Sequence, residues 1–135
     1  MNVIVDTCIW SLALRRRNTS NENEMILRLR ELINESRVQM LGPIRQEILS
    51  GVTATQHFNT LKDYLAAFPD WTTSRTDYEL AAQFYNQCRS KGIQGSNTDF
   101  LICAIASQHN MSIFTTDKDF INYAKIIPVK LFNLS

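Results

Sequence analysis

The sequence predicts an α/β protein, a three-layer α/β/α sandwich with a mainly parallel central sheet. Short apolar runs alternate with longer helical segments, which is typical of crossover connections between parallel strands. One of the helical segments is apolar all round, so we expect it to be deeply buried. The chain of 135 residues has the length of one domain, and we expect residues 1–135 to form a single one.

The expected strands and helices follow one another in a regular order. The strands are short apolar runs at residues 3–5, 38–41, 111–115 and 129–132. The helices cover residues 25–33, 42–50, 58–68, 80–88, 100–106 and 116–123.

Glycine, proline and capping residues indicate several helix ends. Gly42-Pro43 opens one helix and Gly51 is placed to end it, because proline suits a first turn and glycine a C-terminal position. Thr76 and Glu79 have the spacing of a capping box, and Gly92 closes the helix that follows them.

Composition and charge exclude several classes of protein. The chain has 14 Lys and Arg residues against 13 Asp and Glu, a net charge of +1, with 44% hydrophobic residues. These values are those of an ordinary globular chain and not of a collagen-like, coiled-coil or disordered one. The nearly neutral charge also argues against a general nucleic-acid coat protein.

The cysteines, the histidines and the N-terminal residues indicate a cytosolic protein. Cys8, Cys88 and Cys103 are an odd number in apolar contexts, so we expect small buried hydrophobes in a reducing compartment. His57 and His109 lack metal-type partners nearby, and we expect structural or surface roles for both. The acid at position 6 precedes any basic residue, unlike a signal peptide, and no apolar segment approaches the roughly 20 residues that span a bilayer.

Acidic residues follow two of the expected strands and begin the most apolar helix. Asp6 comes directly after the first strand, Asp117 and Asp119 follow the third, and Asp99 lies in the first turn of the apolar helix. Ligands of open α/β sheets bind beyond the carboxyl ends of the strands. We therefore expect these acids to lie at one edge of the sheet.

Glu47 is expected to join them because of its helical phase. At 3.6 residues per turn, Ile44 and Ile48 lie roughly 40° apart and form an apolar stripe along the helix. Glu47 lies roughly 60° from Ile44 on the other side. The Glu47 carboxylate should therefore project close to this stripe, while Arg45 and Gln46 reach water.

Taken singly, each acid also has a structural explanation. Asp99 could be a helix-start acid that the N-terminal helix dipole stabilises, and Asp119 could be the capping-box partner of Thr116. Asp6 could accept hydrogen bonds from loop amides, and Glu47 could form an ion pair with Arg45 or another basic residue. Taken together, carboxylates within about 4–6 Å of one another do not all stay ionised without a cation. Oxygen ligands without His or Cys suit Mg²⁺ or Mn²⁺ and not zinc, and such ions serve phosphoryl chemistry.

Two further patterns bear on function. The run Arg15, Arg16, Arg17 is either a solvated face or part of a phosphate-binding surface, and the sequence leaves both open. The glycine-rich fingerprints of nucleotide-binding loops are absent from the sequence, so a nucleotide cofactor has no support.

Four stretches, in order, resemble PIN domains, and among them the VapC-type toxins of bacterial type II toxin–antitoxin pairs. They are Val3-Ile-Val-Asp6-Thr7, Gly42-Pro-Ile-Arg-Gln-Glu47, Asp99-Phe-Leu-Ile-Cys-Ala-Ile-Ala106 and Thr115-Thr-Asp117-Lys-Asp119-Phe120. The resemblance covers essentially the whole chain.

The resemblance implies a metal-dependent endoribonuclease that hydrolyses phosphodiester bonds in structured RNA, tRNA or rRNA, with a metal-activated water. It implies a Mg²⁺ or Mn²⁺ site at Asp6, Glu47, Asp99 and Asp117, assistance from Asp119, and a polar positioning role for Thr115. It also implies a homodimer and a cognate VapB-like antitoxin whose C-terminal segment covers the active site. If five acids meet in this site, eight remain against the 14 basic residues, which leaves a basic surface for RNA.

The sequence departs from the family pattern at two positions and leaves alternatives open. Cys8 stands where many relatives have a small polar residue, and Thr116 where many have asparagine. One alternative is a PIN-type ribonuclease in RNA processing without an antitoxin. A haloacid-dehalogenase-like phosphatase would need an aspartate at position 8, and a receiver-like module would need paired acids after the first strand.

Overall fold

The computed structural model describes residues 1–15 and 23–134, and it has one parallel sheet across its middle. Its strands are β1 (Val3–Val5), β2 (Val38–Gln39), β3 (Ser112–Phe114) and β4 (Lys130–Leu131), in the order β2-β1-β3-β4. All neighbouring pairs are parallel. Three strands are shorter than predicted, because only part of each apolar run pairs with its neighbour. The side chains of Arg15, Arg16 and Arg17, whose role the sequence left open, lie outside the described part.

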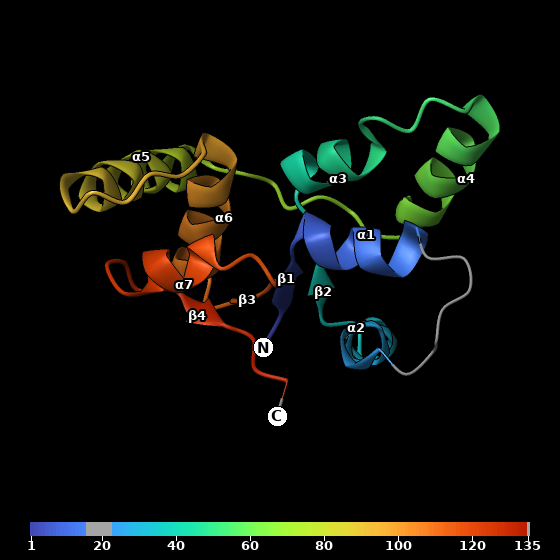
Figure 1. Ribbon diagram of the computed structural model, residues 1–135, viewed down its shortest axis with the longest axis horizontal. Helices are drawn as coiled ribbons and strands as arrows, with labels where there is room; N and C mark the ends of the chain where they lie inside the picture. Colours follow the sequence, from blue (N-terminus) through green and yellow to red (C-terminus); the bar gives the residue numbers. More distant parts are fainter. Residues whose placement is uncertain (16–22, 135) are drawn as a thin grey trace.

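The helices lie on both sides of the strands, which confirms the predicted sandwich. They are α1 (Thr7–Arg15), α2 (Glu24–Asn34), α3 (Gly42–Leu49), α4 (Thr55–Leu65), α5 (Arg75–Ser90), α6 (Asn97–Gln108) and α7 (Asp119–Ala124). Figure 1 shows α5, α6 and α7 on one side of the strands and α1 to α4 on the other.

Helix α1 has no counterpart in the sequence prediction. It starts two residues after β1, and Ile9 and Trp10 at its centre are fully or almost fully buried. Such a short helix is marginal by itself and is stabilised by packing of its apolar face. Its position matters for the site because its first residue, Thr7, follows Asp6.

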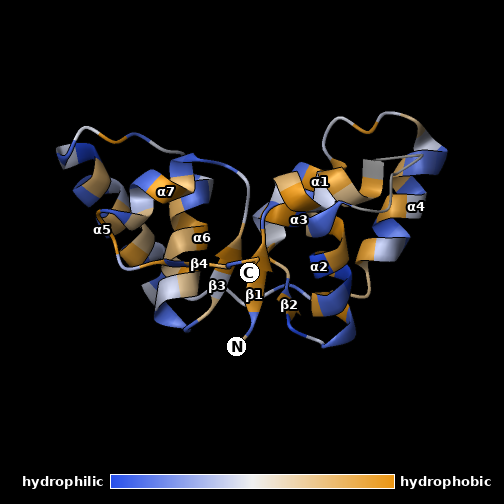
Figure 2. Cartoon of the chain, turned by 60° about the horizontal axis from the view of Figure 1, so that its bottom comes forward, coloured by the Kyte–Doolittle hydropathy of each residue, from blue (hydrophilic) through white to orange (hydrophobic). Residues whose placement is uncertain are grey.

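Helix α6 forms the centre of the core, as its all-round apolar sequence predicts. Every residue from Phe100 to Ala106 is buried. Figure 2 shows α6 and the central strands in the colours of hydrophobic residues. A helix surrounded by protein is held rigidly, so the acid in its first turn, Asp99, has a fixed position.

The predicted helix ends are confirmed with one exception. Pro43 stands in the first turn of α3, and Gly51 and Gly92 have positive φ angles of 86° and 78° just after α3 and α5. The capping box of α5 is Ser74 and Asp77, so the predicted pair at Thr76 and Glu79 is wrong. Both pairs have the same spacing, and the position of the buried Asp77 in the tertiary structure decides between them.

Within the part of the chain that the structure describes, no helix is both long and apolar enough to cross a membrane.

Candidate active site

Three carboxylates from two parts of the chain meet at the carboxyl end of the sheet. Asp99 lies in the first turn of α6, Asp117 lies in the loop after β3, and Asp119 begins α7. One oxygen of each lies within 4.8 Å of one oxygen of the other two. We call these residues the three-carboxylate cluster. Asp119, which was expected to assist a metal site, is a member of this cluster and its side chain is exposed.

Two hydrogen bonds that involve Asp117 hold the loop after β3. The Asp117 amide donates to Thr115 Oγ1 at 3.0 Å, and the Asp119 amide donates to Asp117 Oδ1 at 2.9 Å. The N-cap of α7 is Lys118, and Asp119 is its first residue. The alternative explanation of Asp119 as the partner of a Thr116 cap is therefore wrong.

Asp6 lies beside this loop at the end of β1 and is only 8% exposed. Its carboxylate accepts hydrogen bonds from Thr115 Oγ1 at 2.7 Å and from the Thr7 amide at 2.9 Å. Burial raises the pKa of Asp6 above its ordinary value and repulsion from Glu47 adds to the rise, although these hydrogen bonds oppose it. Asp6 therefore accepts a hydrogen bond from a loop amide, as its structural explanation predicted. Burial still disfavours its ionised form.

Glu47 reaches the site through Thr7. The Thr7 hydroxyl donates to Glu47 Oε1 at 2.6 Å, which joins the first turn of α1 to α3. Glu47 is exposed, so the expectation that it projects close to the apolar stripe is wrong, although its charge contributes to the raised pKa of Asp6.

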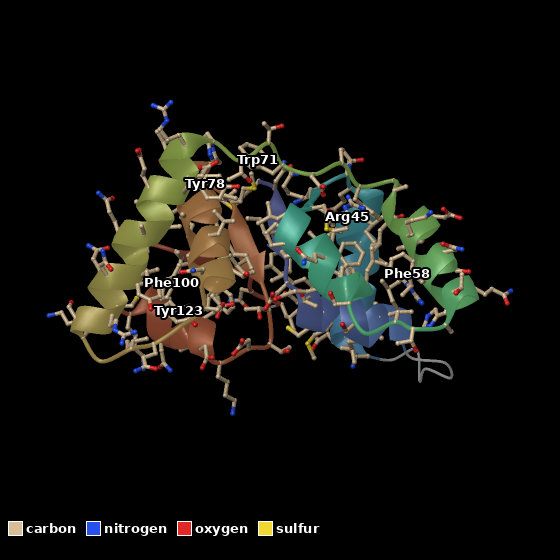
Figure 3. The ribbon with its side chains drawn as sticks, turned by 90° about the horizontal axis from the view of Figure 1, so that it is seen from above. Arg45, Phe58, Trp71, Tyr78, Phe100 and Tyr123 are labelled. Carbon is tan, nitrogen blue, oxygen red and sulfur yellow. The ribbon has the colours of Figure 1, made fainter. Side chains whose placement is uncertain are left out.

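Arg45 does not reach water as predicted, and it does not pair with Glu47. Its side chain is 24% exposed and forms an ion pair with Asp70 at 2.9 Å. Its guanidinium also donates to the carbonyls of Leu65, the last residue of α4, and of Phe68, just after this helix. Figure 3 shows Arg45 among the side chains between α3 and the segments next to it.

Asp99 is half-buried, and burial raises its pKa, with repulsion from Asp6 and Asp117 adding to the rise. Its amide donates to Ser96 Oγ at 3.0 Å, so the N-cap of α6 fixes its backbone. Its Oδ2 accepts a hydrogen bond from the phenol of Tyr123 at 2.7 Å, which lowers the pKa but does not offset the burial.

The donor set fits a hard divalent cation. The five site acids are Asp6, Glu47, Asp99, Asp117 and Asp119, and none of the ion pairs in the described residues includes any of them. Burial raises the pKa values of Asp6 and Asp99 and repulsion between the carboxylates adds to the rise, and a cation would remove this repulsion. The ligands are oxygens, as Mg²⁺ and Mn²⁺ require.

Cys8 is not the buried hydrophobe that its sequence context predicted. It is half-buried, and its sulfur lies 3.4 Å from Thr115 Oγ1 and 3.7 Å from Asp6 Oδ2. Thr116 also donates to this sulfur from its amide and its hydroxyl. Cys88 and Cys103 are buried as expected.

Sequence reasoning missed Thr7 and Tyr123 as members of the site. The signal for Thr7 was its position directly after Asp6. The signal for Tyr123 was its spacing of four residues from Asp119, which places both on one face of a helix. Their contacts with acids far away in sequence require the folded chain.

The chain is similar to known proteins over most of its length. The model of the PIN domain family matches residues 3–126. The chain is 30% identical over 128 residues to VapC ribonuclease Mb1587 of Mycobacterium bovis, and the match covers 92% of each chain.

Solved structures share the fold over the full length. FitAcB from Neisseria gonorrhoeae superposes with a TM-score of 0.77 at 20% identity and covers 98% of this chain and 97% of its own. VapBC2 from Rickettsia felis, bound to a DNA fragment from its promoter, has a TM-score of 0.77 at 17% identity and covers 98% of each chain. With acids at the ends of β1 and β3 and at the start of α6, this chain belongs to the PIN domain family and is of the VapC type.

Proposed function

We propose that this protein is a metal-dependent endoribonuclease and the toxin of a toxin–antitoxin pair. Its substrate is structured RNA, tRNA or rRNA. The observation that carries the proposal is the three-carboxylate cluster, with oxygens within 4.8 Å and no basic partner among the described ion pairs. The name of the Mycobacterium bovis relative, a VapC ribonuclease, supports the activity.

In this proposal the chain's acids divide between holding a cation and completing its shell. Asp6 and Asp99 hold the principal ion, Mg²⁺ or Mn²⁺. Glu47 and Asp117 complete the site directly or through water, and Asp119 lies next to them. When bound, such an ion lowers the pKa of a coordinated water and neutralises charge on the phosphate.

The residues around the acids determine their orientation. Thr115 donates to Asp6 Oδ2 and accepts from the Asp117 amide, so one hydroxyl orients acids from β1 and from the loop after β3. Thr7 binds Asp6 through its amide and Glu47 through its hydroxyl. The acids then present oxygen atoms to a phosphodiester, whose hydrolysis leaves 5′-phosphate and 3′-hydroxyl ends.

The charge of the remaining surface suits RNA. Eight acids outside the site stand against 14 basic residues, so a cation-filled site would leave a basic surface. The proposed partners are RNA, a VapB-like antitoxin and a second copy of this chain, in the reducing cytosol that three free cysteines favour.

Cleavage of RNA by the purified protein tests the activity. We expect cleavage of tRNA or rRNA with Mg²⁺ or Mn²⁺, and its loss in EDTA. Asp6→Ala and Asp99→Ala should each lower the rate by more than about 100-fold, because each removes a cation ligand. Asp63→Ala, an exposed acid on α4, is the matched control and should leave the rate unchanged. Full EDTA-sensitive activity in either site variant contradicts the assignment.

Growth on induction distinguishes a toxin from an RNA-processing enzyme. We expect induction to arrest growth, and co-expression of a short neighbouring open reading frame to relieve the arrest. A protein that cleaves RNA without arresting growth is a processing enzyme of the same family. Phosphate trapped covalently on Asp6 would instead indicate the phosphatase.

A further inference from the structure

A phenol from α7 holds one oxygen of the three-carboxylate cluster. Tyr123 donates its hydroxyl hydrogen to Asp99 Oδ2 at 2.7 Å. Within the described residues this is the one hydrogen bond that a side chain donates to a carboxylate of the cluster, since the Asp117 carboxylate accepts from a backbone amide. The contact joins the first turn of α6 to α7, 24 residues later in the chain.

The aromatic ring of Tyr123 cannot easily move away from Asp99. Tyr123 is fully buried, and its ring centre lies 4.8 Å from that of Phe100 and 5.2 Å from that of Phe120. Figure 3 shows Tyr123 next to Phe100 beside α6. Buried aromatic pairs of this kind have a fixed geometry, so the hydroxyl has a fixed position too.

Gly95 confines the hydroxyl from another side. A Cβ atom at position 95 would lie 2.3 Å from the Tyr123 hydroxyl oxygen and 2.8 Å from its Cζ. Glycine is needed here because of this close approach and not for an unusual backbone angle, since its φ lies outside the left-handed region. The segment before α6 is thus shaped around the phenol.

We infer that Tyr123 is a positioning residue that makes Asp99 bind a cation through one oxygen and thereby favours Mg²⁺ or Mn²⁺ over Ca²⁺. The inference rests on the proposed function, because it assigns Tyr123 a role in that same site. Asp99 cannot turn to offer both oxygens without weakening its hydrogen bond to the fixed phenol.

The preference follows from the coordination habits of the ions. Mg²⁺ requires a small octahedral shell of single oxygens, whereas the larger Ca²⁺ accepts carboxylates through one or two oxygens in a flexible shell. A carboxylate held at one oxygen suits the first type of shell. A carboxylate that is free to turn is less well placed for the octahedral shell of Mg²⁺. It can offer its second oxygen to Ca²⁺ as a further ligand.

Calorimetric titration of Mn²⁺ and of Ca²⁺ into the metal-free protein tests this role. In Tyr123→Phe the ring packing stays and the hydroxyl is removed. We expect the Kd for Mn²⁺ to rise about 10-fold, the range found when an outer hydrogen-bond partner of a metal ligand is lost. The Kd for Ca²⁺ should change less than about threefold, so the preference for Mn²⁺ falls.

Tyr85→Phe is the matched control. Tyr85 also packs against Phe100, at 5.6 Å between ring centres, but its hydroxyl accepts from Arg89. This variant should keep both Kd values. Gly95→Ala is a second variant, whose added methyl group would displace the phenol, and it should raise the Kd for Mn²⁺ as Tyr123→Phe does. Thermal unfolding of the metal-free proteins establishes that each variant is folded.

The outcomes separate this inference from the proposed function. If the wild type binds Mn²⁺ and Tyr123→Phe keeps both the affinity and the preference, the positioning role is wrong and the nuclease proposal stands. If Gly95→Ala keeps the wild-type Kd for Mn²⁺, the result also counts against the role. If the wild type binds no Mn²⁺, both proposals fail.

Discussion

The carboxylate of Asp6 shows how hydrogen bonds orient a charge without neutralising it. Thr115 and the Thr7 amide hold its two oxygens, yet burial keeps the pKa of Asp6 above its ordinary value. Asp99 has the same combination of hydrogen bonds and a raised pKa. Two repelling carboxylates, one buried and one half-buried, lower the stability of the metal-free protein and would be stabilised by a cation.

These pKa shifts predict how the stability of the metal-free protein depends on pH. Both groups have a higher pKa in the folded chain than the value of 3.8 expected when unfolded. Their contribution to stability is therefore fully present below that value and is lost as the pH rises through the folded pKa values. In EDTA, Asp6→Asn and Asp99→Asn should each reduce this loss, as measured by urea unfolding between pH 4 and 7.

Asp63→Asn, on the exposed side of α4, is the control and should follow the wild-type pH dependence. A wild-type dependence in both site variants would show that neither carboxylate titrates with a raised pKa.

At the scale of elements, α3 is held in place by Arg45 while it presents Glu47 to the site. Arg45 binds the Leu65 carbonyl at 2.9 Å, the Phe68 carbonyl and the Asp70 carboxylate, all in or just after the end of α4. The guanidinium reaches these three acceptors with donors spread over a rigid planar fork, whereas the ammonium group of lysine carries all its donors on one nitrogen atom. Arg45 thus acts on the structure and not on the chemistry.

Arg45→Lys should lower the free energy of unfolding by about 1–2 kcal/mol, because acceptors lose their donors. Arg30→Lys, an exposed arginine of α2, should change it little. Urea unfolding of both variants measures the difference. Equal stability of the two variants would mean that the three contacts of Arg45 are replaced by water without loss.

A second buried group, Asp77, fixes the start of α5 against the end of α6. It accepts hydrogen bonds from Trp71 at 3.3 Å, Gln108 at 2.6 Å and His109 at 2.9 Å. Burial alone would raise the pKa of Asp77, but the hydrogen bonds from Ser74, His109, Trp71 and Gln108 outweigh it and lower the pKa. His109 therefore has the structural role that its sequence context predicted.

At the scale of the whole molecule, the parallel sheet brings together charges that the sequence separates. The order β2-β1-β3-β4 places β1 beside β3, so residues 6 and 115–117 become neighbours although more than a hundred residues lie between them. The stability of the fold and the occupancy of the proposed site should be linked, because the acids that would hold a cation meet only where these strands are paired.

Metal binding should therefore stabilise the whole fold. With free Mn²⁺ at 100 times its Kd, the free energy of unfolding should rise by about 2.7 kcal/mol at pH 7. Asp99→Asn should show little of this rise, while Asp63→Asn should show all of it. Thermal unfolding with Mn²⁺ and with EDTA measures the effect. A rise of the same size in Asp99→Asn would place the ion elsewhere.

Much of the fold could be predicted from the sequence because its signals are local. The β-branched run of β1, the all-round apolar sequence of α6 and the Pro43, Gly51 and Gly92 signals each depend on neighbouring residues. The acids at the ends of strands also followed from local order, since a parallel sheet has one carboxyl edge. The short helix α1 could not be predicted in this way, because burial of Ile9 and Trp10 by other elements stabilises it.

By itself, the sequence determined the fold class and the order of the strands and of the helices other than α1, and it predicted a set of acids for a cation site. Only the tertiary structure decided how these side chains meet. Arg45 turns inward because α4 ends beside it, and Glu47 is reached through Thr7. The Tyr123 hydroxyl binds Asp99 because Gly95 leaves room for it. Each of these contacts joins residues at least 20 positions apart, and such contacts depend on packing that local sequence patterns do not encode.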